Sequence, residues 1–158
     1  MTTINLVEAD ADITGSRVAI VMSKYNQYIG DSLLKGCVAV LNDSGIYNSA
    51  ITLVKVPGAY EIPVVARKLA DQEVYDAIIT LGAIIRGETP HFDYIAASCA
   101  NGIAEVAADY GIPVIFGVLT VDNVQQAQDR AGNEESNKGA EAARAAVEMI
   151  SIMKKVAS

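Results

Sequence analysis

The sequence predicts an α/β fold in which a central sheet of four parallel strands lies between helices on both faces. Short apolar segments of strand length alternate four times with longer segments whose apolar residues recur at helical spacing. Each short segment is almost continuously apolar, which is typical of a parallel strand covered on both faces. Such an alternation predicts a flavodoxin-like three-layer sandwich that forms a single domain over residues 1–158.

Four segments have the composition of buried strands, and turn residues follow them. They are Arg17–Ser23, Ile51–Val56, Tyr75–Leu81 and Val114–Leu119. A further segment, Ile4–Val7, alternates apolar and polar residues and is predicted to be a very short strand. The acidic stretch Glu8–Asp12 separates it from the predicted core, so we expect this strand to add to the edge of a neighbouring subunit's sheet.

The intervening segments have apolar residues at helical spacing. The expected helices span about Tyr28–Leu41, Ala59–Asp71, Phe92–Tyr110, Val121–Ala131 and Lys138–Lys155. Pro63 fits only the first turn of its helix because it lacks an N–H group. The third and fifth helices carry more small and apolar residues than one thin sheet covers, which predicts a subunit interface.

Composition excludes several classes of protein. The chain has 158 residues, is 51% hydrophobic and has a formal net charge of −7, which disfavours disorder and a nucleic-acid-binding surface. It contains no apolar run of about 18 residues and no secretory signal pattern, so we expect no membrane span and a cytoplasmic location. Cys37 and Cys99 lie in predicted helices without metal-ligand spacing, and they are expected to be reduced core thiols.

The stretch Leu81–Tyr94 contains the residues best suited to catalysis. It runs from Leu81 to Tyr94 as LGAIIRGETPHFDY and contains His91, the single histidine of the chain. In open α/β sheets, ligands bind beyond the carboxyl ends of the strands, and this stretch follows the third predicted strand. A lone histidine in a loop is more often a surface or capping residue than a catalyst, so the stretch alone does not predict catalysis.

Other segments at predicted strand ends strengthen the functional interpretation. Lys24–Asn26 follows the first strand, Pro57–Glu61 the second, and the segment from Thr120 the fourth; Arg130 and the run Asn137–Gly139 come later. Together with the Leu81–Tyr94 stretch, the motifs VPGAYEIP, PVIFGVLT, QAQDRAG and NKGAEAA resemble the 6,7-dimethyl-8-ribityllumazine synthase family. The resemblance covers roughly Arg17 to Met153.

The resemblance implies a transferase that catalyses the penultimate step of riboflavin biosynthesis. The family condenses 5-amino-6-(D-ribitylamino)uracil with 3,4-dihydroxy-2-butanone 4-phosphate, giving 6,7-dimethyl-8-ribityllumazine, phosphate and water. It uses no metal and no organic cofactor. The chemistry agrees with the motifs, because an imidazole suits proton transfers near neutral pH and an arginine fork suits phosphate.

The resemblance also implies a role for particular residues. His91 is the catalytic residue that moves protons. Glu88, Thr89 and Arg130 contact the phosphate, and Lys138 and Glu141 are further candidates near it. The ribitylaminouracil contacts are Tyr25, Asn26, Ala59, Tyr60, Glu61, Ala83, Ile84, Ile85 and Phe116, with Tyr25 stacking on the ring and Phe116 reaching it from a neighbouring subunit.

The sequence departs from the family pattern at three places. Tyr25 stands where Phe or Trp is usual, and its ring is still expected to stack. Glu88 stands where a small residue is usual; we expect its carboxylate to point to solvent, away from the phosphate. The segment 133–136 replaces a more basic loop that contains glycine and helps to set shell curvature in the family.

The resemblance predicts a homo-oligomer of at least five subunits with active sites shared between neighbours. The sequence leaves open whether assembly stops at a pentamer or continues to an icosahedral shell of sixty subunits, and it leaves open riboflavin synthase as a further partner. The alternative functions are a flavin- or phosphate-binding module of the same fold, a response-regulator receiver, and a shell protein with an inactive site. A receiver is disfavoured because no acidic pair follows the first strand and no Asp ends the third. The loop SKYNQYIGDS lacks the Ser/Thr-rich run of flavodoxins, and the retention of His91 and Arg130 disfavours an inactive site.

Overall fold

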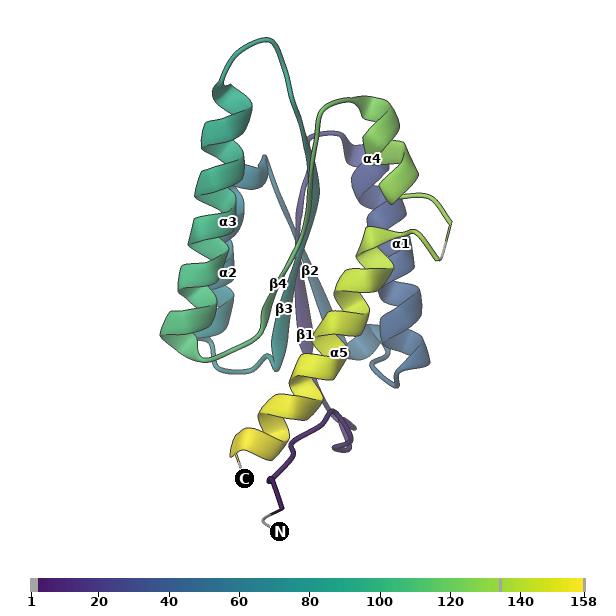
Figure 1. Cartoon of the computed structure of the whole chain (residues 1–158), viewed down its shortest axis with the longest axis vertical. Coiled ribbons are helices and arrows are strands. Elements are labelled where there is room, and N and C mark those ends of the chain that lie inside the picture. The colour runs from purple at the N-terminus through teal and green to yellow at the C-terminus, as the bar shows by residue number, and fades with distance from the viewer. Residues whose placement is uncertain (1–2, 134, 158) are drawn as a thin grey trace.

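A computed structural model describes residues 3–133 and 135–157. Its sheet has four parallel strands in the order β2-β1-β3-β4: β1 (Val18–Ser23), β2 (Ile51–Val56), β3 (Ala77–Ile85) and β4 (Val114–Val121). Figure 1 shows helices on both faces of this sheet. The predicted α/β, flavodoxin-like three-layer architecture with four parallel strands is confirmed.

The helices divide between the two faces. α2 (Ile62–Asp71) and α3 (His91–Tyr110) cover one face, whereas α1 (Gln27–Asp43), α4 (Val124–Arg130) and α5 (Lys138–Ala157) cover the other (Figure 1). Each face has its own buried apolar cluster, because parallel strands that are covered on both sides bury alternate side chains in opposite directions.

The chain reverses its direction of winding between β1 and β3. After β1 it adds β2 on one side, and β3 then pairs with the other side of β1. The helices that follow β1 and β3 therefore lie on opposite faces of the sheet, and such a switch point leaves a crevice at the carboxyl ends of the strands.

Two predicted boundaries were wrong, the first because of pairing with a distant strand and the second because of a local turn. β3 continues to Ile85 instead of ending at Leu81, since β4 pairs with it as far as the Ile85–Val121 pair. The helix expected from Ala59 begins at Ile62, after the 3₁₀ turn Ala59–Glu61. Pro63 lies in the first turn of α2, as predicted, and its missing N–H prevents a helix from extending further back.

The helix α4 also starts later than expected. Its range was predicted as about Val121–Ala131, but β4 extends through Val121 and the helix begins at Val124. Asn123 ends the turn between them, and its side-chain oxygen accepts a hydrogen bond from the Gln126 N–H at 2.9 Å. This side-chain cap satisfies a backbone donor that a helix start leaves free.

Several small residues of α5 are buried within the chain, and a subunit interface on α3 and α5 stays a prediction. The buried alanines are Ala140, Ala142, Ala143 and Ala146. A Cβ atom on Gly139 would lie 2.0 Å from the Leu33 carbonyl oxygen, so only glycine allows α5 to approach α1 this closely. The small residues of α5 therefore allow its first turn to lie close to α1 inside the chain.

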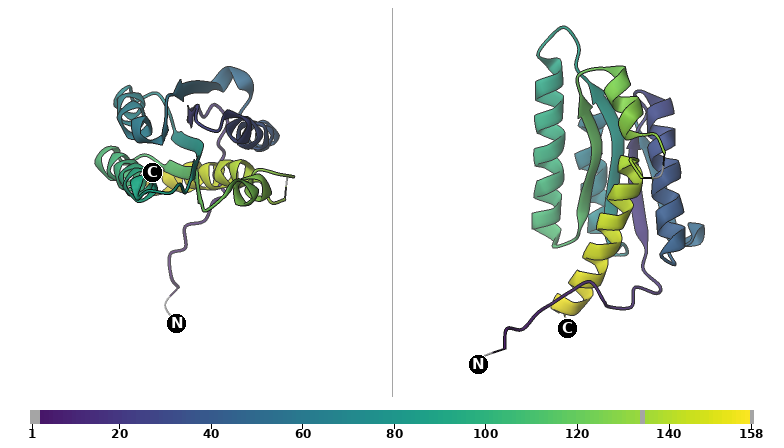
Figure 2. Two further views of the ribbon diagram at one scale, coloured as in Figure 1. Left: turned by 90° about the horizontal axis from the view of Figure 1, so that it is seen from above. Right: turned by 45° about the vertical axis from the view of Figure 1, so that its right-hand side comes forward.

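The N-terminal segment lies outside the layers. Ile4–Val7 forms no strand in its own chain, and Ile4 is 86% exposed. Figure 2 shows this segment extending away from the sheet and helices. A strand needs partners for its backbone groups, and no other segment of the described chain supplies them here, so strand formation on a neighbouring subunit stays a prediction.

Candidate active site

A cleft of about 640 Å³ opens at the carboxyl ends of the strands, beside the switch point of the sheet. We call it the His91 cleft. Its lining residues are Tyr25, Asn26, Gly58, Ala59, Tyr60, Glu61, Ala83, Ile84, Ile85, His91, Ile95 and Val124. Nine of the residues that the sequence predicts for the site lie together here, from three separate strand ends. Gly58, Ile95 and Val124 complete the lining without having been predicted.

The loop after β1 is tied to both neighbouring strands. The Lys24 N–H donates to the Val56 carbonyl at 2.8 Å, which continues the pairing of β1 with β2. Asn26 adopts a left-handed backbone conformation with φ of 56°, and its Nδ2 donates to the Ala83 carbonyl at 3.3 Å. This turn presents the neighbouring Tyr25 ring to the cleft, where it is 75% exposed.

The last three residues of β3, Ala83–Ile85, line the cleft. β1 pairs with β3 only as far as Leu81, whereas β4 pairs with Ala83–Ile85. One edge of the Ala83–Ile85 backbone is therefore not covered by a strand, and it faces the side on which the cleft lies. Gly82 permits this arrangement, because a Cβ atom there would lie 2.2 Å from the Ser23 hydroxyl.

His91 is the first residue of α3 and is exposed at the rim of the cleft. Its backbone N–H donates to the Thr89 hydroxyl at 3.4 Å. The imidazole makes no hydrogen bond to any residue in the described part of the chain, so both ring nitrogens are free to exchange protons with a bound molecule. Glu88 and Thr89 lie on the exposed loop before it and do not line the cleft.

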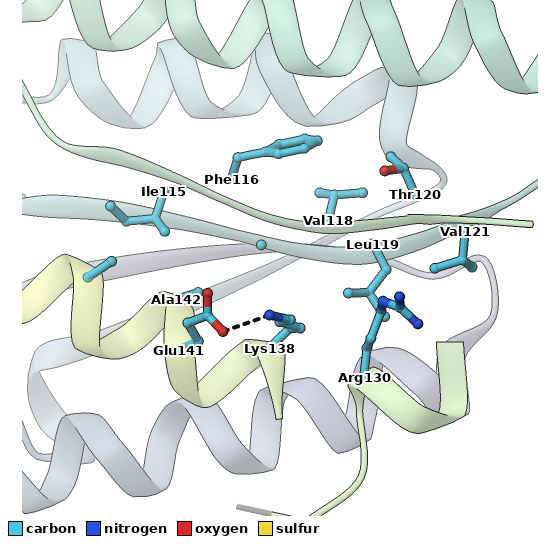
Figure 3. Close-up of a pocket in the computed structure, with 12 residues that line it drawn as sticks. Ile115, Phe116, Val118, Leu119, Thr120, Val121, Arg130, Lys138, Glu141 and Ala142 are labelled. Carbon is cyan, nitrogen blue, oxygen red and sulfur yellow. Dashed lines mark hydrogen bonds and ion pairs between the residues drawn. The ribbon is translucent and has the colours of Figure 1, made fainter. Parts of the chain in front are cut away.

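The remaining predicted residues lie in a second cavity, which we call the Arg130 groove. It has a volume of about 380 Å³ and follows the edge strand β4 (Figure 3). Its lining includes Phe116, Arg130, Lys138 and Glu141 beside Ile115, Gly117, Val118, Leu119, Thr120, Val121, Ala142 and Ala145. The His91 cleft and the Arg130 groove have no lining residue in common, so one chain does not bring His91 and Arg130 into the same cavity.

The charged groups of the groove come from α4 and α5. Lys138 Nζ lies 2.8 Å from Glu141 Oε2, and Arg130 Nη1 donates to the Gln126 carbonyl at 3.1 Å. Figure 3 shows Arg130 and Lys138 on one side of β4 and Phe116 on the other. The Phe116 ring is 43% exposed on the edge strand.

Asn137 holds the segment that joins the charged residues of the groove. It is buried, and its Nδ2 donates to the carbonyls of Ser32, Ala131 and Gly132 at 3.0–3.3 Å. Its Oδ1 accepts a hydrogen bond from the Ala140 N–H at 3.0 Å, which caps the first turn of α5. The sequence motif contained Asn137, but a side chain that bonds to a residue 105 positions away gives no local signal.

Both cysteines are buried in the core, as predicted. Burial raises the pKa of the Cys37 thiol to about 12 and that of the Cys99 thiol to about 11. Neither thiol lines the cleft or the groove. Residues 3–133 and 135–157 contain no group of three or more His, Cys, Asp and Glu side chains placed to hold a metal ion.

The 6,7-dimethyl-8-ribityllumazine synthase family model matches residues 15–154, which is nearly the whole chain. The chain belongs to this family. The resemblance predicted from the motifs is therefore confirmed, and the chain is an enzyme of the transferase type. Membership implies lumazine synthase activity in riboflavin biosynthesis, small-molecule substrates and an oligomeric state. No helix in the described part of the chain has the length and apolar character needed to cross a membrane.

Proposed function

We propose that the chain condenses 5-amino-6-(D-ribitylamino)uracil with 3,4-dihydroxy-2-butanone 4-phosphate to give 6,7-dimethyl-8-ribityllumazine, phosphate and water. The observation that carries the proposal is the gathering of nine predicted residues in the His91 cleft. The volume of the cleft, about 640 Å³, lies within the range usual for sites that bind small molecules. On this proposal the chain acts as one domain in the penultimate step of riboflavin biosynthesis.

The His91 cleft suits a flat heterocycle with a polar chain. The exposed Tyr25 ring stacks on the pyrimidine, since aromatic faces attract one another in offset geometry. The uncovered backbone edge of Ala83–Ile85 binds the polar edge of the ring. Asn26, Ala59, Tyr60 and Glu61 lie beside these groups and hold the ribityl chain through backbone and side-chain hydrogen bonds.

His91 moves protons in the reaction. The amino group of the uracil attacks the ketone carbon, and the resulting carbinolamine loses water. Phosphate is then eliminated, which leaves a carbonyl group on the neighbouring carbon. The nitrogen that carries the ribityl chain attacks this carbonyl to close the ring, and a second water is lost. Each step transfers a proton, and an exposed imidazole at the rim of the cleft can accept or donate it. The other part of the barrier reduction comes from holding two substrates together.

Phosphate recognition requires the Arg130 groove, which we propose is supplied by a neighbouring subunit. Arg130 and Lys138 provide positive charge, and Glu141 orients Lys138. Thr89 and the Glu88 N–H contribute from the loop before His91, with the Glu88 carboxylate directed to solvent. Phe116 of the neighbour covers the heterocycle, which would bury a ring that one chain leaves exposed.

The family resemblance implies that this sharing takes place in a homo-oligomer of at least five subunits, which we propose for the chain in the cytoplasm. A head-to-tail interface repeats around a ring, so the groove of each subunit meets the cleft of the next. The exposed Ile4–Val7 segment adds to a neighbour's sheet in this arrangement. Further assembly into a sixty-subunit icosahedral shell, and association with riboflavin synthase, are extensions of the same proposal.

The proposal is tested by mixing the protein with both substrates and following lumazine fluorescence. Absence of product from a correctly folded oligomer would refute the assigned reaction and favour a binding module or an inactive shell protein. Sedimentation of an active species at the mass of one chain would refute the shared site.

A mixing experiment tests the shared site directly. His91→Ala subunits keep an intact groove, and Arg130→Ala subunits keep an intact cleft. After subunit exchange in an equal mixture, about a quarter of the interfaces in a cyclic ring join an intact cleft to an intact groove. With the phosphate sugar kept far below the raised KM of Arg130→Ala, we expect that share of the wild-type activity to return. No recovery after proven exchange would contradict the shared site.

A further inference from the structure

Arg86 connects three segments beside the His91 cleft without lining it. It directly follows β3, and its backbone N–H donates to the Val121 carbonyl at 2.8 Å, which extends the pairing with β4 by one bond. Its Nε donates to Asp122 Oδ1 at 3.0 Å, and its Nη1 donates to Asp93 Oδ1 at 3.3 Å. The guanidinium carbon also lies 4.3 Å from the centre of the Phe92 ring.

These contacts close the loop that carries His91. Asp93 and Phe92 belong to the first turn of α3, so the guanidinium joins the start of the loop at Arg86 to its end. Between them, Gly87, Glu88 and Thr89 are exposed, and the His91 imidazole has no hydrogen bond within the described chain that would orient it. The direction of the imidazole therefore depends on how firmly the first turn of α3 is held against β3.

The same guanidinium also holds the turn before Val124, which lines the cleft. Asp122 lies in the turn between β4 and α4, where its N–H donates to Gln126 Oε1 at 2.7 Å. Val124, two residues later, lines the His91 cleft together with Ile85 and His91. A planar fork with several donors can hold two carboxylates in fixed directions, whereas a lysine ammonium cannot.

The guanidinium is partly exposed, so each ion pair alone contributes little to stability. Its role lies in its geometry, because one planar group contacts a carboxylate and an aromatic ring of α3 and a second carboxylate after β4. The hydrogen bond to Asp122 and the nearby Asp93 carboxylate raise the pKa of the Arg86 guanidinium further, so the group stays charged.

We propose that Arg86 is a positioning residue for His91, holding the first turn of α3 and the β4–α4 turn in the arrangement that the proton transfers need. The inference rests on the proposed function of His91. Arg86 itself lies in the lining of neither cavity, so it acts through the residues that it holds.

The test compares Arg86→Ala with Arg67→Ala in the assembled enzyme. Arg67 is a matched control, since it pairs with Asp109 at 2.7 Å and lies 5.5 Å from the Tyr110 ring centre, away from both cavities. We expect Arg86→Ala to lower kcat by about tenfold while the KM for the heterocycle changes by less than about twofold. Arg86→Lys is expected to restore only part of the rate, and Arg67→Ala to stay within about twofold of wild type.

A double variant separates positioning from a general structural defect. In the His91→Ala background, Arg86→Ala should cause less than about a twofold further loss, because the group that it positions is already gone. If the two substitutions multiply, Arg86 does not act through His91 and the proposal is wrong.

Amide hydrogen exchange gives a readout that does not depend on the reaction. Exchange in residues 87–93 should rise in Arg86→Ala and stay unchanged in Arg67→Ala. Unchanged exchange in Arg86→Ala would overturn the proposal even if wild-type enzyme makes lumazine. If wild-type enzyme makes none while exchange rises, the proposed reaction fails and the structural part of the inference stands. Should Arg86→Ala not fold, Asp93→Asn removes one of the two charged partners and is expected to raise the same exchange.

Discussion

The His91 cleft and the Arg130 groove differ in what they can bind. The cleft is lined by aromatic and aliphatic side chains, backbone groups and the side chains of Glu61 and His91. The groove follows an edge strand and carries Arg130 and Lys138 with the partner carboxylate of Glu141. The cleft thus suits an uncharged ring, and the groove suits an anion, so neither cavity alone has the chemistry for both proposed substrates.

Their positions in the sheet explain the difference. The cleft lies where the winding direction changes between β1 and β3, and three strand ends converge there. β4 is the edge strand, so the groove beside it has no further strand to close it. An edge strand with an exposed aromatic residue is a surface that proteins normally cover. On the proposed function, the active site is divided between these two surfaces of one chain and is completed by assembly.

The largest expected effect is on the cleft. His91→Ala should slow single-turnover lumazine formation by about one to three orders of magnitude, because a positioned acid–base group is lost. Residual activity is expected, since substrate positioning remains. Rapid-mixing fluorescence measures the rate, and an unchanged single-turnover rate would remove His91 from the mechanism.

The corresponding substitution in the groove, at Arg130, should weaken binding of the phosphate sugar. Arg130→Ala should raise the apparent KM for the phosphate sugar about 30-fold or more, because losing one partner of a desolvated ion pair costs about 2–5 kcal/mol. The KM for the uracil should change little. Arg130→Lys keeps the charge without the fork and should lie between the two. Equal increases in both KM values would contradict the division of roles between cleft and groove.

A third substitution tests how much Asn137, which holds the groove residues in place, contributes to stability. Asn137→Ala should lower the free energy of unfolding by roughly 2–3 kcal/mol, because it removes a helix cap and leaves buried carbonyls without a donor. Urea unfolding measures it, with Gly132→Ala as a nearby control whose added Cβ meets nothing closer than 3.5 Å. We expect the control to change stability by less than about 0.5 kcal/mol. Equal losses in the two variants would show that Asn137 makes no special contribution.

The smallest expected effect is the dependence of stability on pH that the buried thiols of the two apolar clusters cause. Cys37 belongs to the cluster under α1 and Cys99 to the cluster under α3. Because burial raises the pKa of Cys37 to about 12 and of Cys99 to about 11, the folded state favours the neutral thiols. The stabilisation is fully present below the ordinary thiol pKa of 9.0 and is lost as the pH rises toward these values.

At pH 10 this loss should be about 1 kcal/mol for each thiol. Urea unfolding at pH 8 and pH 10 measures it, and a Cys37→Ala, Cys99→Ala double variant should lose less stability between the two pH values. Both native thiols should resist alkylation at pH 8. Rapid labelling of either one in the folded protein would show that its core is open.

Local sequence patterns determined the fold and most of the cleft. Apolar runs and helical spacing report burial over a few residues, so β1, α3 and the position of Pro63 were predictable. The carboxyl ends of parallel strands always meet at one end of a sheet, so the segments that contain Tyr25, Glu61 and His91 were predicted to lie together without knowledge of the strand order. The family resemblance then named these residues as parts of the site.

Only the tertiary structure decided which predicted residues share a cavity. Placing Arg130 and Phe116 apart from His91 depends on β4 being the edge strand and on how α4 and α5 pack, and neither property is encoded in a local pattern. The extension of β3 likewise depends on its pairing with β4. The bonds of Asn137 to Ser32 and of Arg86 to Asp122 join residues distant in the chain, and side-chain periodicity carries no information about such partners.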